Sequence, residues 1–288
     1  MTAHVEKLRG ARVGVALSSG FFGFFHHAGA LEALASRGIV PARITGNSAG
    51  ALVGAMYAAG LEPAEISAEL LSVARADFWD PGWPFSARGF GFLAGEKLAA
   101  RIARALPVHG FAECRVPLSL GVYGLADGRT RHLKSGALVP AVRASCAVPY
   151  MFQPVEIGGR TYWDGGFGEK TPLAPFIEAG DVDAVVVSYL PPRDAEPGGK
   201  RRNPLSFLPK PSALLAETPS DERIERDRAA VAILRERGVR VLVLGPTPVK
   251  LGPFSLERGE EAVRAGREGV GRILDSEDGS ALGSPQLS

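Results

Sequence analysis

A serine stands between two glycines in the stretch "ITGNSAGALVGAMYAAG" (44–60), in the pattern Gly46-x-Ser48-x-Gly50. A short apolar run precedes the serine and a stretch with helical spacing follows it, which predicts a strand-to-helix turn at Ser48. Such a turn exposes the serine oxygen at the carboxyl end of a sheet, beside the N–H groups and positive dipole end of the helix. Ser48 is therefore a candidate nucleophile, and an ordinary N-cap serine in a Gly-rich turn is the alternative.

A serine nucleophile needs a base within hydrogen-bond reach. None of the five histidines lies in the late loop where the serine–acid–histidine order of common α/β-hydrolases places the base. His26 and His27 precede Ser48 and flank a Gly-rich loop, so we expect them to line the site rather than to act as the base.

An acidic residue has a more suitable position in "GGRTYWDGGFGEKTP" (158–172). Asp164 directly follows a predicted strand and precedes Gly165 and Gly166, which let the backbone bend around it. A carboxylate is a weak base in water, but a water-poor pocket and direct contact with the serine raise its basicity. The sequence predicts a two-residue Ser48–Asp164 catalyst, with a plain Asp–Gly–Gly turn as the alternative.

The loop "SSGFFG" (18–23) follows the first predicted strand. Its two glycines allow several backbone amides to point inward together. If this loop lies beside the Ser48 turn, its N–H groups and that of Ala49 form an oxyanion hole. The loop donors that we predict are Gly20, Phe21, Phe22 and Gly23.

In this order, the segments resemble the patatin-like phospholipase family over most of residues 12–175. "ITGNSAGALVGAMYAAGLEP" is similar to the family's nucleophile block, and "ASCAVPYMFQPVEIGGRTYWDGG" is similar to its Asp-Gly-Gly/Ala block. The resemblance implies that Ser48 is the nucleophile and Asp164 the base. It also implies a three-layer α/β/α fold with a mostly parallel central sheet, and hydrolysis of lipid acyl esters without metal or organic cofactor.

Two segments depart from the family pattern. Family members usually carry Gly-Gly-Gly-x-Arg/Lys-Gly in the oxyanion loop, whereas Phe22 stands here where the basic residue would be. The segment "FGEKTP" (167–172) lacks the Asn pair often found after the Asp block. Two alternatives therefore remain open: a general carboxylesterase or thioesterase, and a catalytically weakened relative that binds a lipid or a partner.

The remaining pattern predicts the elements that position these residues. Strand, helix, strand and helix follow one another over 12–17, 27–38, 42–46 and 49–60, which indicates a parallel sheet covered on both faces. Further helices are predicted at 62–75, 95–106, 139–147, 223–237 and 257–274. Further strands are predicted within 116–133, where two flank Asp127–Gly128, and at 155–157, 160–163, 183–190 and 239–245. We expect one hydrolase domain over 1–275, mobile segments at 192–222 and beyond 276, and a disordered tail over 276–288.

The segment "FWDPGWPFSARGFGFL" (78–93) concentrates aromatic residues, Pro and Gly, which predicts an irregular, lid-like loop. Trp79 and Trp83 are candidate substrate-lining residues from this segment. Phe24 is a further candidate, although its place close to the start of a helix favours burial in the core. Such a surface suits an acyl chain or peripheral contact with a membrane.

Composition limits the other classes of function. The net charge of +2 over 288 residues is too weak to indicate nucleic-acid binding. Cys114 and Cys146 have neither metal-site spacing nor a disulfide framework, which favours a reducing compartment. The N-terminus, with "VGVALSSGFFGFF" (13–25) after basic residues, imitates a secretory signal, but the same run serves as a core strand and its loop. We expect a cytoplasmic enzyme.

Overall fold

The computed structural model describes residues 3–86, 89–191, 220–245, 249 and 251–276. Most of the predicted mobile segment 192–222 and nearly all of the tail lie outside these residues. No helix within the described ranges combines the length and apolarity that a bilayer crossing needs.

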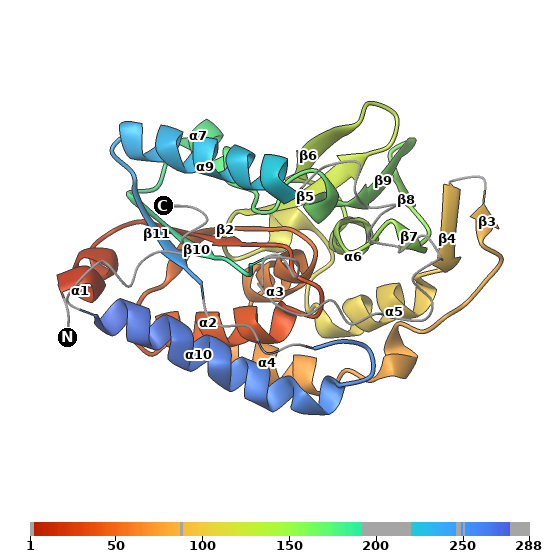
Figure 1. Cartoon of the computed structure of the whole chain (residues 1–288), viewed down its shortest axis with the longest axis horizontal. Helices are drawn as coiled ribbons and strands as arrows, with labels where there is room; N and C mark the ends of the chain where they lie inside the picture. Colours follow the sequence, from red (N-terminus) through yellow and green to blue (C-terminus); the bar gives the residue numbers. More distant parts are fainter. Residues whose placement is uncertain (1–2, 87–88, 192–219, 246–248, 250, 277–288) are drawn as a thin grey trace.

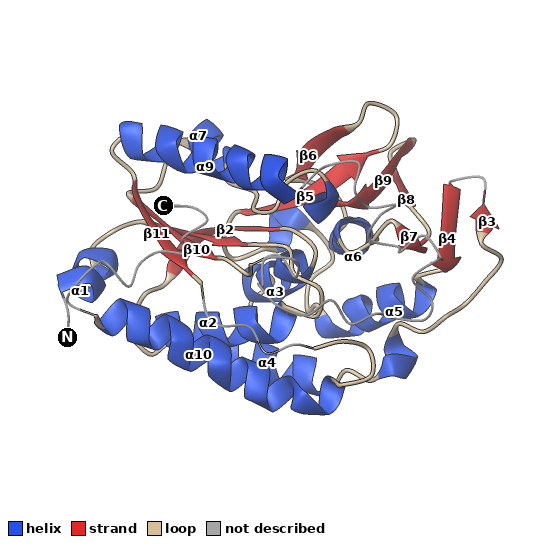
Figure 2. Cartoon of the chain, in the orientation of Figure 1, coloured by secondary structure: helices blue, strands red, loops and turns tan. Residues whose placement is uncertain are grey.

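An eight-stranded sheet forms the centre of the molecule (Figures 1 and 2). Its strand order is β11-β10-β1-β2-β5-β9-β8, with β6 pairing β5 as a branch. The pairs from β11 to β5 are parallel, whereas β6, β8 and β9 run antiparallel to their neighbours. The strands are β1 (Val13–Leu17), β2 (Pro41–Gly46), β5 (Leu118–Gly124), β6 (Arg129–Leu133), β8 (Val155–Ile157), β9 (Arg160–Asp164), β10 (Ala184–Ser188) and β11 (Arg240–Leu244). The prediction of a mostly parallel sheet is confirmed.

Helices cover both faces of the sheet, as Figure 1 shows. Successive side chains of a strand point to opposite faces, so Val15 and Leu17 enter one core cluster and Ala16 enters the other. The first cluster packs against α2 (Phe24–Ala35), α3 (Ala49–Ala58), α4 (Pro63–Leu71) and α10 (Gly259–Asp275), and the second against α7 (Ala174–Ala179) and α9 (Ser220–Glu236). This arrangement confirms the three-layer α/β/α prediction.

Three further α-helices of the described residues are α1 (Ala3–Arg9), α5 (Glu96–Ala105) and α6 (Leu138–Ser145). Helix α1 has no counterpart in the predicted elements. Helix α2 begins at Phe24 rather than at residue 27, because the turn that ends at Gly23 leads directly into it and Phe25 is buried in the core.

The prediction of an irregular loop at 78–93 is wrong for its second half. Strands β3 (Phe85–Ser86) and β4 (Gly89–Leu93) form a hairpin, and β4 pairs in parallel with β7 (Tyr150–Phe152) at the right-hand end of Figure 1. Pro and Gly obscured the alternation of "GFGFL". A Cβ at Gly91 would collide with the backbone of β7, so glycine permits this close pairing.

Candidate active site

Ser48 occupies a strained turn between β2 and α3. Its backbone dihedrals are φ 53° and ψ −117°, a conformation that costs a non-glycine residue on the order of 1–3 kcal/mol. A Cβ at Gly46 would strike the carbonyl of Gly50, and one at Gly50 would strike the carbonyl of Leu17. Both positions therefore require glycine, as the prediction of a tight turn supposed.

Two side-chain groups that the sequence reasoning missed hold this turn. The Ser48 N–H donates to Ser145 Oγ at 3.0 Å, and the Ser145 hydroxyl donates to the Gly121 carbonyl at 2.6 Å. Asn47 precedes the nucleophile candidate, and its side-chain amide donates to the Glu169 carbonyl at 3.0 Å. The backbone amide of Ser48 is thus already used by the fold.

Strand register brings Ser48 and Asp164 to the same level on either side of β5. Gly46, two residues before Ser48, pairs with Leu120. Asp164 pairs with Val122, two residues further along β5. The Ser48 hydroxyl lies close enough to the Asp164 carboxylate to favour its ionised form. The structure therefore brings together the two residues that the sequence analysis paired.

Asp164 is 4% exposed at the end of β9. Burial raises the pKa of its carboxyl from 3.8 to about 6, because the buried ionised form lacks the water that would solvate its charge. The Ser48 hydroxyl, the Gly166 N–H, which donates at 2.7 Å, and the positive charges of Arg223 and Lys170 oppose this increase in pKa. The result is a carboxylate that is more basic than usual and still ionises near neutrality.

The Asp–Gly–Gly turn packs directly against the loop 18–23. A Cβ at Gly165 would strike the Gly121 carbonyl. A Cβ at Gly166 would lie 2.5 Å from Ser19 Cβ and 3.0 Å from Asp164 Oδ1, so Ser19 and the Asp164 carboxylate are neighbours around Gly166. The loop after β1 is consequently adjacent to the Ser48–Asp164 pair.

The loop itself forms a tight turn, in which the Gly23 N–H donates to the Gly20 carbonyl at 2.8 Å. Phe22 adopts φ 57°, and a Cβ at Gly20 or Gly23 would strike the Leu190 side chain. Within the described chain, no backbone–backbone hydrogen bond uses the N–H of Gly20, Phe22 or Ala49. These amides are available to an oxyanion, whereas the N–H of Gly23 is not.

His27 supports the start of this loop. It is fully buried, and its ring nitrogens lie 2.8 Å from the Ser18 carbonyl and 2.9 Å from Ser188 Oγ. Because a carbonyl only accepts, Nε2 carries the proton and Nδ1 accepts from Ser188. Burial lowers the pKa of His27 to about 3, so the ring is neutral.

His26 is also buried, and its Nε2 accepts the Val249 N–H at 2.8 Å. Burial lowers the pKa of His26 to about 4. Among the hydrogen bonds of the described residues, none joins either histidine to Ser48 or Asp164. Both histidines therefore bond to the surrounding fold, at Ser18, Ser188 and Val249.

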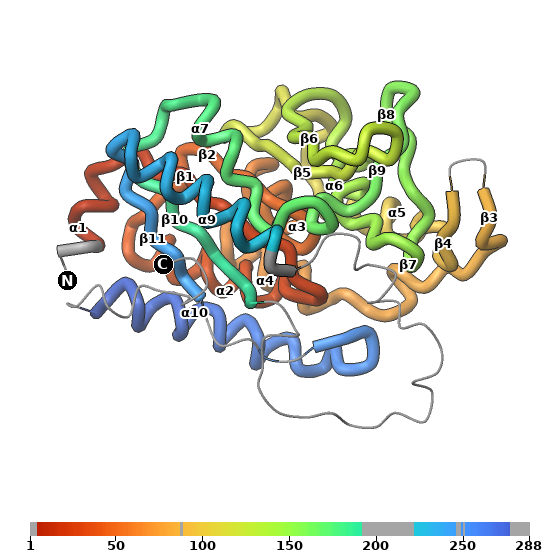
Figure 3. The backbone as a smooth tube through the Cα atoms, turned by 45° about the horizontal axis from the view of Figure 1, so that its top comes forward, coloured from red at the N-terminus to blue at the C-terminus, as the bar shows by residue number. Residues whose placement is uncertain are grey.

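Cations on neighbouring segments hold the turn after Asp164. Arg223 and Arg226, near the start of α9, donate to the carbonyls of Gly166 at 2.6 Å and Gly168 at 2.9 Å. Figure 3 shows this end of α9 against the green chain that follows β9. Lys170 is 6% exposed, and its Nζ donates to the Ser19 carbonyl at 2.8 Å. None of these three residues was predicted to support the site, because a charged residue in a loop or on a polar helix is usually solvated.

The segment 78–93 flanks the site from two sides. The Phe78 ring lies 5.6 Å from the ring of Phe22 in the loop after β1. A second aromatic path runs from Phe90 through Tyr150 to Trp163, the neighbour of Asp164, with centroid distances of 6.3 and 5.6 Å.

The exposure of the predicted lining residues differs widely. Trp79 is 48% and Trp83 is 77% exposed, so both present their rings to solvent. Phe85 and Phe92, on the β3–β4 hairpin, are 64% and 61% exposed. Phe24, in contrast, is partly buried at the start of α2, with its ring 5.6 Å from that of Phe22.

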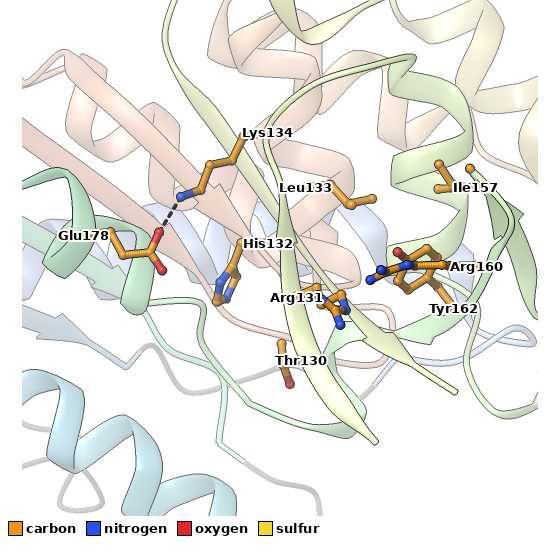
Figure 4. A pocket seen from close by; sticks show the side chains of 10 residues that line it. Thr130, Arg131, His132, Leu133, Lys134, Ile157, Arg160, Tyr162 and Glu178 are labelled. Atoms are coloured by element: carbon orange, nitrogen blue, oxygen red, sulfur yellow. Dashed lines mark hydrogen bonds and ion pairs between the residues drawn. The ribbon is translucent and has the colours of Figure 1, made fainter. Parts of the chain in front are cut away.

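A separate cavity of about 530 Å³ lies along β6 and the β8–β9 turn, and neither Ser48 nor Asp164 lines it (Figure 4). Its cations are mostly neutralised: Lys134 pairs with Glu178, as the dashed line in Figure 4 marks, and Arg131 pairs with Asp127.

Among the described residues, no group of three or more His, Cys, Asp or Glu side chains is arranged to hold a metal ion.

Comparisons with known proteins agree with this architecture. An uncharacterized NTE family protein of Mycobacterium tuberculosis is 32% identical over 194 residues, covering 65% of this chain and 52% of that protein. The lysophospholipase NTE1 of Cryptococcus neoformans var. neoformans serotype D is 26% identical over 198 residues, covering 67% of this chain and 12% of that protein. The chain thus spans about half or less of the length of these relatives. The crystal structure of VipD from Legionella pneumophila shares the fold, with a TM-score of 0.50, 14% identity, and coverage of 93% of this chain and 67% of that one.

The family whose sequence model matches is described as patatin-like phospholipase, and the match extends over residues 15–177. This range includes the loop after β1, the Ser48 turn and the Asp164 turn, and it is more than half of the 288 residues. The chain therefore belongs to the patatin-like phospholipase family.

Proposed function

We propose that this chain is a serine lipid acyl hydrolase in which Ser48 is the nucleophile and Asp164 is the general base and acid. The meeting of Ser48 with a buried carboxylate on either side of β5 carries the proposal, and burial raises the pKa of that carboxylate to about 6. A serine hydroxyl is a poor nucleophile until a neighbouring base accepts its proton. A base whose pKa is close to the working pH is both ionised and able to take that proton.

In the proposed mechanism, Ser48 Oγ attacks the ester carbonyl while its proton passes to Asp164. The negative charge that forms on the carbonyl oxygen is bound by backbone N–H groups of the Ala49 turn and of the loop at Gly20 and Phe22. Asp164 then gives the proton to the departing alcohol. A water molecule then attacks the acyl carbon while its proton passes to Asp164. The bond between Ser48 Oγ and the acyl group breaks, Asp164 returns the proton to Ser48 Oγ, and the fatty acid is released.

We propose a lipid ester as the substrate because apolar rings surround the Ser48–Asp164 pair. Phe22 and Phe78 lie on the side of the loop after β1, and Trp163 adjoins Asp164. The aromatic side chains of Trp83 and Phe85 are exposed at the surface of the protein. Exposed aromatic rings can insert into the interface between the headgroups and the acyl chains of a bilayer. Peripheral membrane contact through Trp83 and the β3–β4 hairpin is part of the proposal, and we propose a cytoplasmic location.

The test compares wild type with Ser48→Ala, Asp164→Asn and the surface variant Ser72→Ala. We expect p-nitrophenyl butyrate hydrolysis and fluorophosphonate labelling in the wild type and in Ser72→Ala. Ser48→Ala should lose both, and Asp164→Asn should lose at least about a thousandfold in kcat, as for removal of a member of a catalytic pair. Full turnover in either site variant would end the assignment.

Substrate class is decided with the same proteins. We expect hydrolysis of lysophospholipid and of phospholipid vesicles by the wild type, with no activity in Ser48→Ala. Cleavage of short esters or thioesters alone would favour the general carboxylesterase or thioesterase alternative. Failure of the fluorophosphonate probe to label Ser48 in the folded wild type would favour a lipid-binding relative without catalysis.

A further inference from the structure

Lys170 is joined to the loop after β1 by two hydrogen bonds. Its ammonium donates to the Ser19 carbonyl at 2.8 Å, and its own carbonyl accepts the Ser19 N–H at 2.8 Å. The side chain is 6% exposed, and its Nζ lies 5.7 Å from the centre of the Tyr189 ring. Ser19 and Lys170 are thus joined by one backbone–backbone and one side chain–backbone hydrogen bond, although they lie 151 positions apart in the sequence.

The bond to the Ser19 carbonyl fixes the direction of the next amide. The described chain has no cis peptide bonds, and in a trans peptide the C=O and the following N–H point in opposite directions. With the Ser19 carbonyl directed at Lys170, the Gly20 N–H points away from Lys170. No backbone–backbone bond of the described chain uses that N–H, and Ser19 adjoins the Asp164 carboxylate at Gly166.

Packing alone does not account for a charged side chain at the buried position 170. A buried ammonium is costly, and an apolar side chain of similar volume is often neutral or stabilising in its place. The loop "SSGFFG" carries no charged side chain of its own. Phe22, within the loop, has a left-handed backbone conformation. Lys170 therefore supplies positive charge to this loop from the turn after Asp164.

We propose that Lys170 is a positioning residue of the Ser48–Asp164 hydrolase: its ammonium orients the Ser19–Gly20 peptide so that the Gly20 N–H is directed at the oxyanion. This inference rests on the proposed function and adds a residue to it. Lys170 acts through the peptide, without contact to the substrate. Its charge also favours the negative oxyanion that the peptide binds.

Several titratable or charged groups face Lys170: Asp164 at the end of β9, Tyr189 after β10, Arg223 and Asp227 of α9, and His27 of α2. The pKa of Lys170 is lowered to about 7, chiefly by burial and also by Arg223, and Asp227 and Asp164 oppose this decrease. Asp164 must be ionised and Lys170 protonated for full activity. The wild-type pH profile should therefore rise near pH 6 and fall as Lys170 loses its proton, near or above pH 7.

The experiment compares wild type, Lys170→Met, Lys170→Arg and the exposed-lysine control Lys7→Met on p-nitrophenyl butyrate. We expect Lys170→Met to lose about tenfold to a hundredfold in kcat, with KM changed less than about threefold. This loss is smaller than the roughly hundredfold to thousandfold loss on removal of an oxyanion donor, because the Gly20 N–H is misdirected and not removed. The melting temperature of Lys170→Met should be unchanged or higher, because an apolar group replaces a buried charge. Lys7→Met should match the wild type.

The pH profile supplies the readout that a purely structural role would not change. Lys170→Met should lose the alkaline fall, and its acid limb should move to higher pH, since removing a positive charge raises the pKa of Asp164. Lys170→Arg should recover part of kcat and carry no alkaline fall, because arginine stays protonated. If Lys170→Met does not fold, the comparison of Lys170→Arg with the wild type decides the same point.

The outcomes separate this inference from the proposed function. A wild type that labels with fluorophosphonate at Ser48, beside a Lys170→Met protein with the same kcat and the same alkaline limb, would overturn only the role of Lys170. Loss of kcat in proportion to a lower melting temperature, with no recovery in Lys170→Arg, would also overturn it. A wild type that neither labels nor hydrolyses any ester would overturn both.

Discussion

Replacement of Asp164 by Asn should make the protein more stable at alkaline pH while it removes the proposed base. The folded carboxyl has a pKa of about 6, against 3.8 for the ordinary group, because burial penalises its charge. The difference is about 2 pH units, and at about 1.36 kcal/mol for each unit the ionised form costs the fold up to about 3 kcal/mol. Asparagine keeps an oxygen that can accept the Gly166 N–H and carries no charge.

The sign of the effect follows from linkage. Below pH 3.8 the carboxyl is protonated in both the folded and the unfolded chain, and the penalty is absent. As pH rises through about 6, the folded carboxyl ionises and the stability contributed by its neutral form is lost. Asp164→Asn should therefore match the wild type near pH 4 and exceed it in unfolding free energy by as much as about 3 kcal/mol at pH 8.

The assay is urea unfolding of both proteins at several pH values between 4 and 8. Asp181→Asn is the matched control, because two bonds from Arg43 lower the pKa of Asp181 and its contribution is present above its ordinary pKa and lost as pH falls. That variant should be less stable than the wild type at pH 8. A stability difference for Asp164→Asn that is absent at pH 8, or equal at all pH values, would refute the account of Asp164 as a buried, charge-penalised base.

Two further predictions concern the Ser48 turn and the aromatic hairpin. Gly50→Ala should lose about 1–3 kcal/mol of unfolding free energy and most ester hydrolysis, measured by urea unfolding and p-nitrophenyl butyrate turnover, because the added Cβ meets the Leu17 carbonyl; unchanged stability would contradict the close packing. Trp83→Ser should weaken binding to phosphatidylcholine–phosphatidylglycerol vesicles about tenfold in a sedimentation assay, or 1.4 kcal/mol, with unchanged turnover of the short ester. Val40→Ser, which removes a 70% exposed side chain directly before β2, should bind like the wild type. Equal binding by Trp83→Ser would contradict membrane contact through Trp83.

The sequence predicted those features whose causes are local. Apolar runs and the order strand, helix, strand fixed the parallel part of the sheet and its two helical layers, and the helix after Ser48 follows from its small residues. The pairing of Ser48 with Asp164 is a contact between distant segments. The Gly-rich turns around the two residues predict it, and the resemblance of two blocks to one family supports it. Strand register around β5 then supplies the physical reason that these blocks meet.

What the sequence did not predict depends on contacts between segments far apart in the chain. Lys170 and Arg223 look like solvated charges by type, and only the packed structure shows them donating to carbonyls of Ser19 and Gly166. Strand β4 was missed because its partner is β7, whose residues lie about 60 positions later, and because its glycines indicate a loop when taken alone. The strand propensity of a segment carries no information about a distant segment that pairs with it.

A dyad without histidine requires one carboxyl group both to accept and to release a proton, so its pKa must lie between that of a free aspartate and that of a fully desolvated one. Two opposing influences set this value at Asp164: burial increases the pKa, and the donors and cations on the same turn reduce it. Removing Arg223 or Lys170 therefore has the same predicted sign, a higher pKa for Asp164. Only Lys170 also holds the Ser19–Gly20 peptide, whereas Arg223 holds the carbonyl of Gly166. The two cations thus belong to different halves of the proposed chemistry, the oxyanion on one side and the base on the other, although both tune the same carboxyl group.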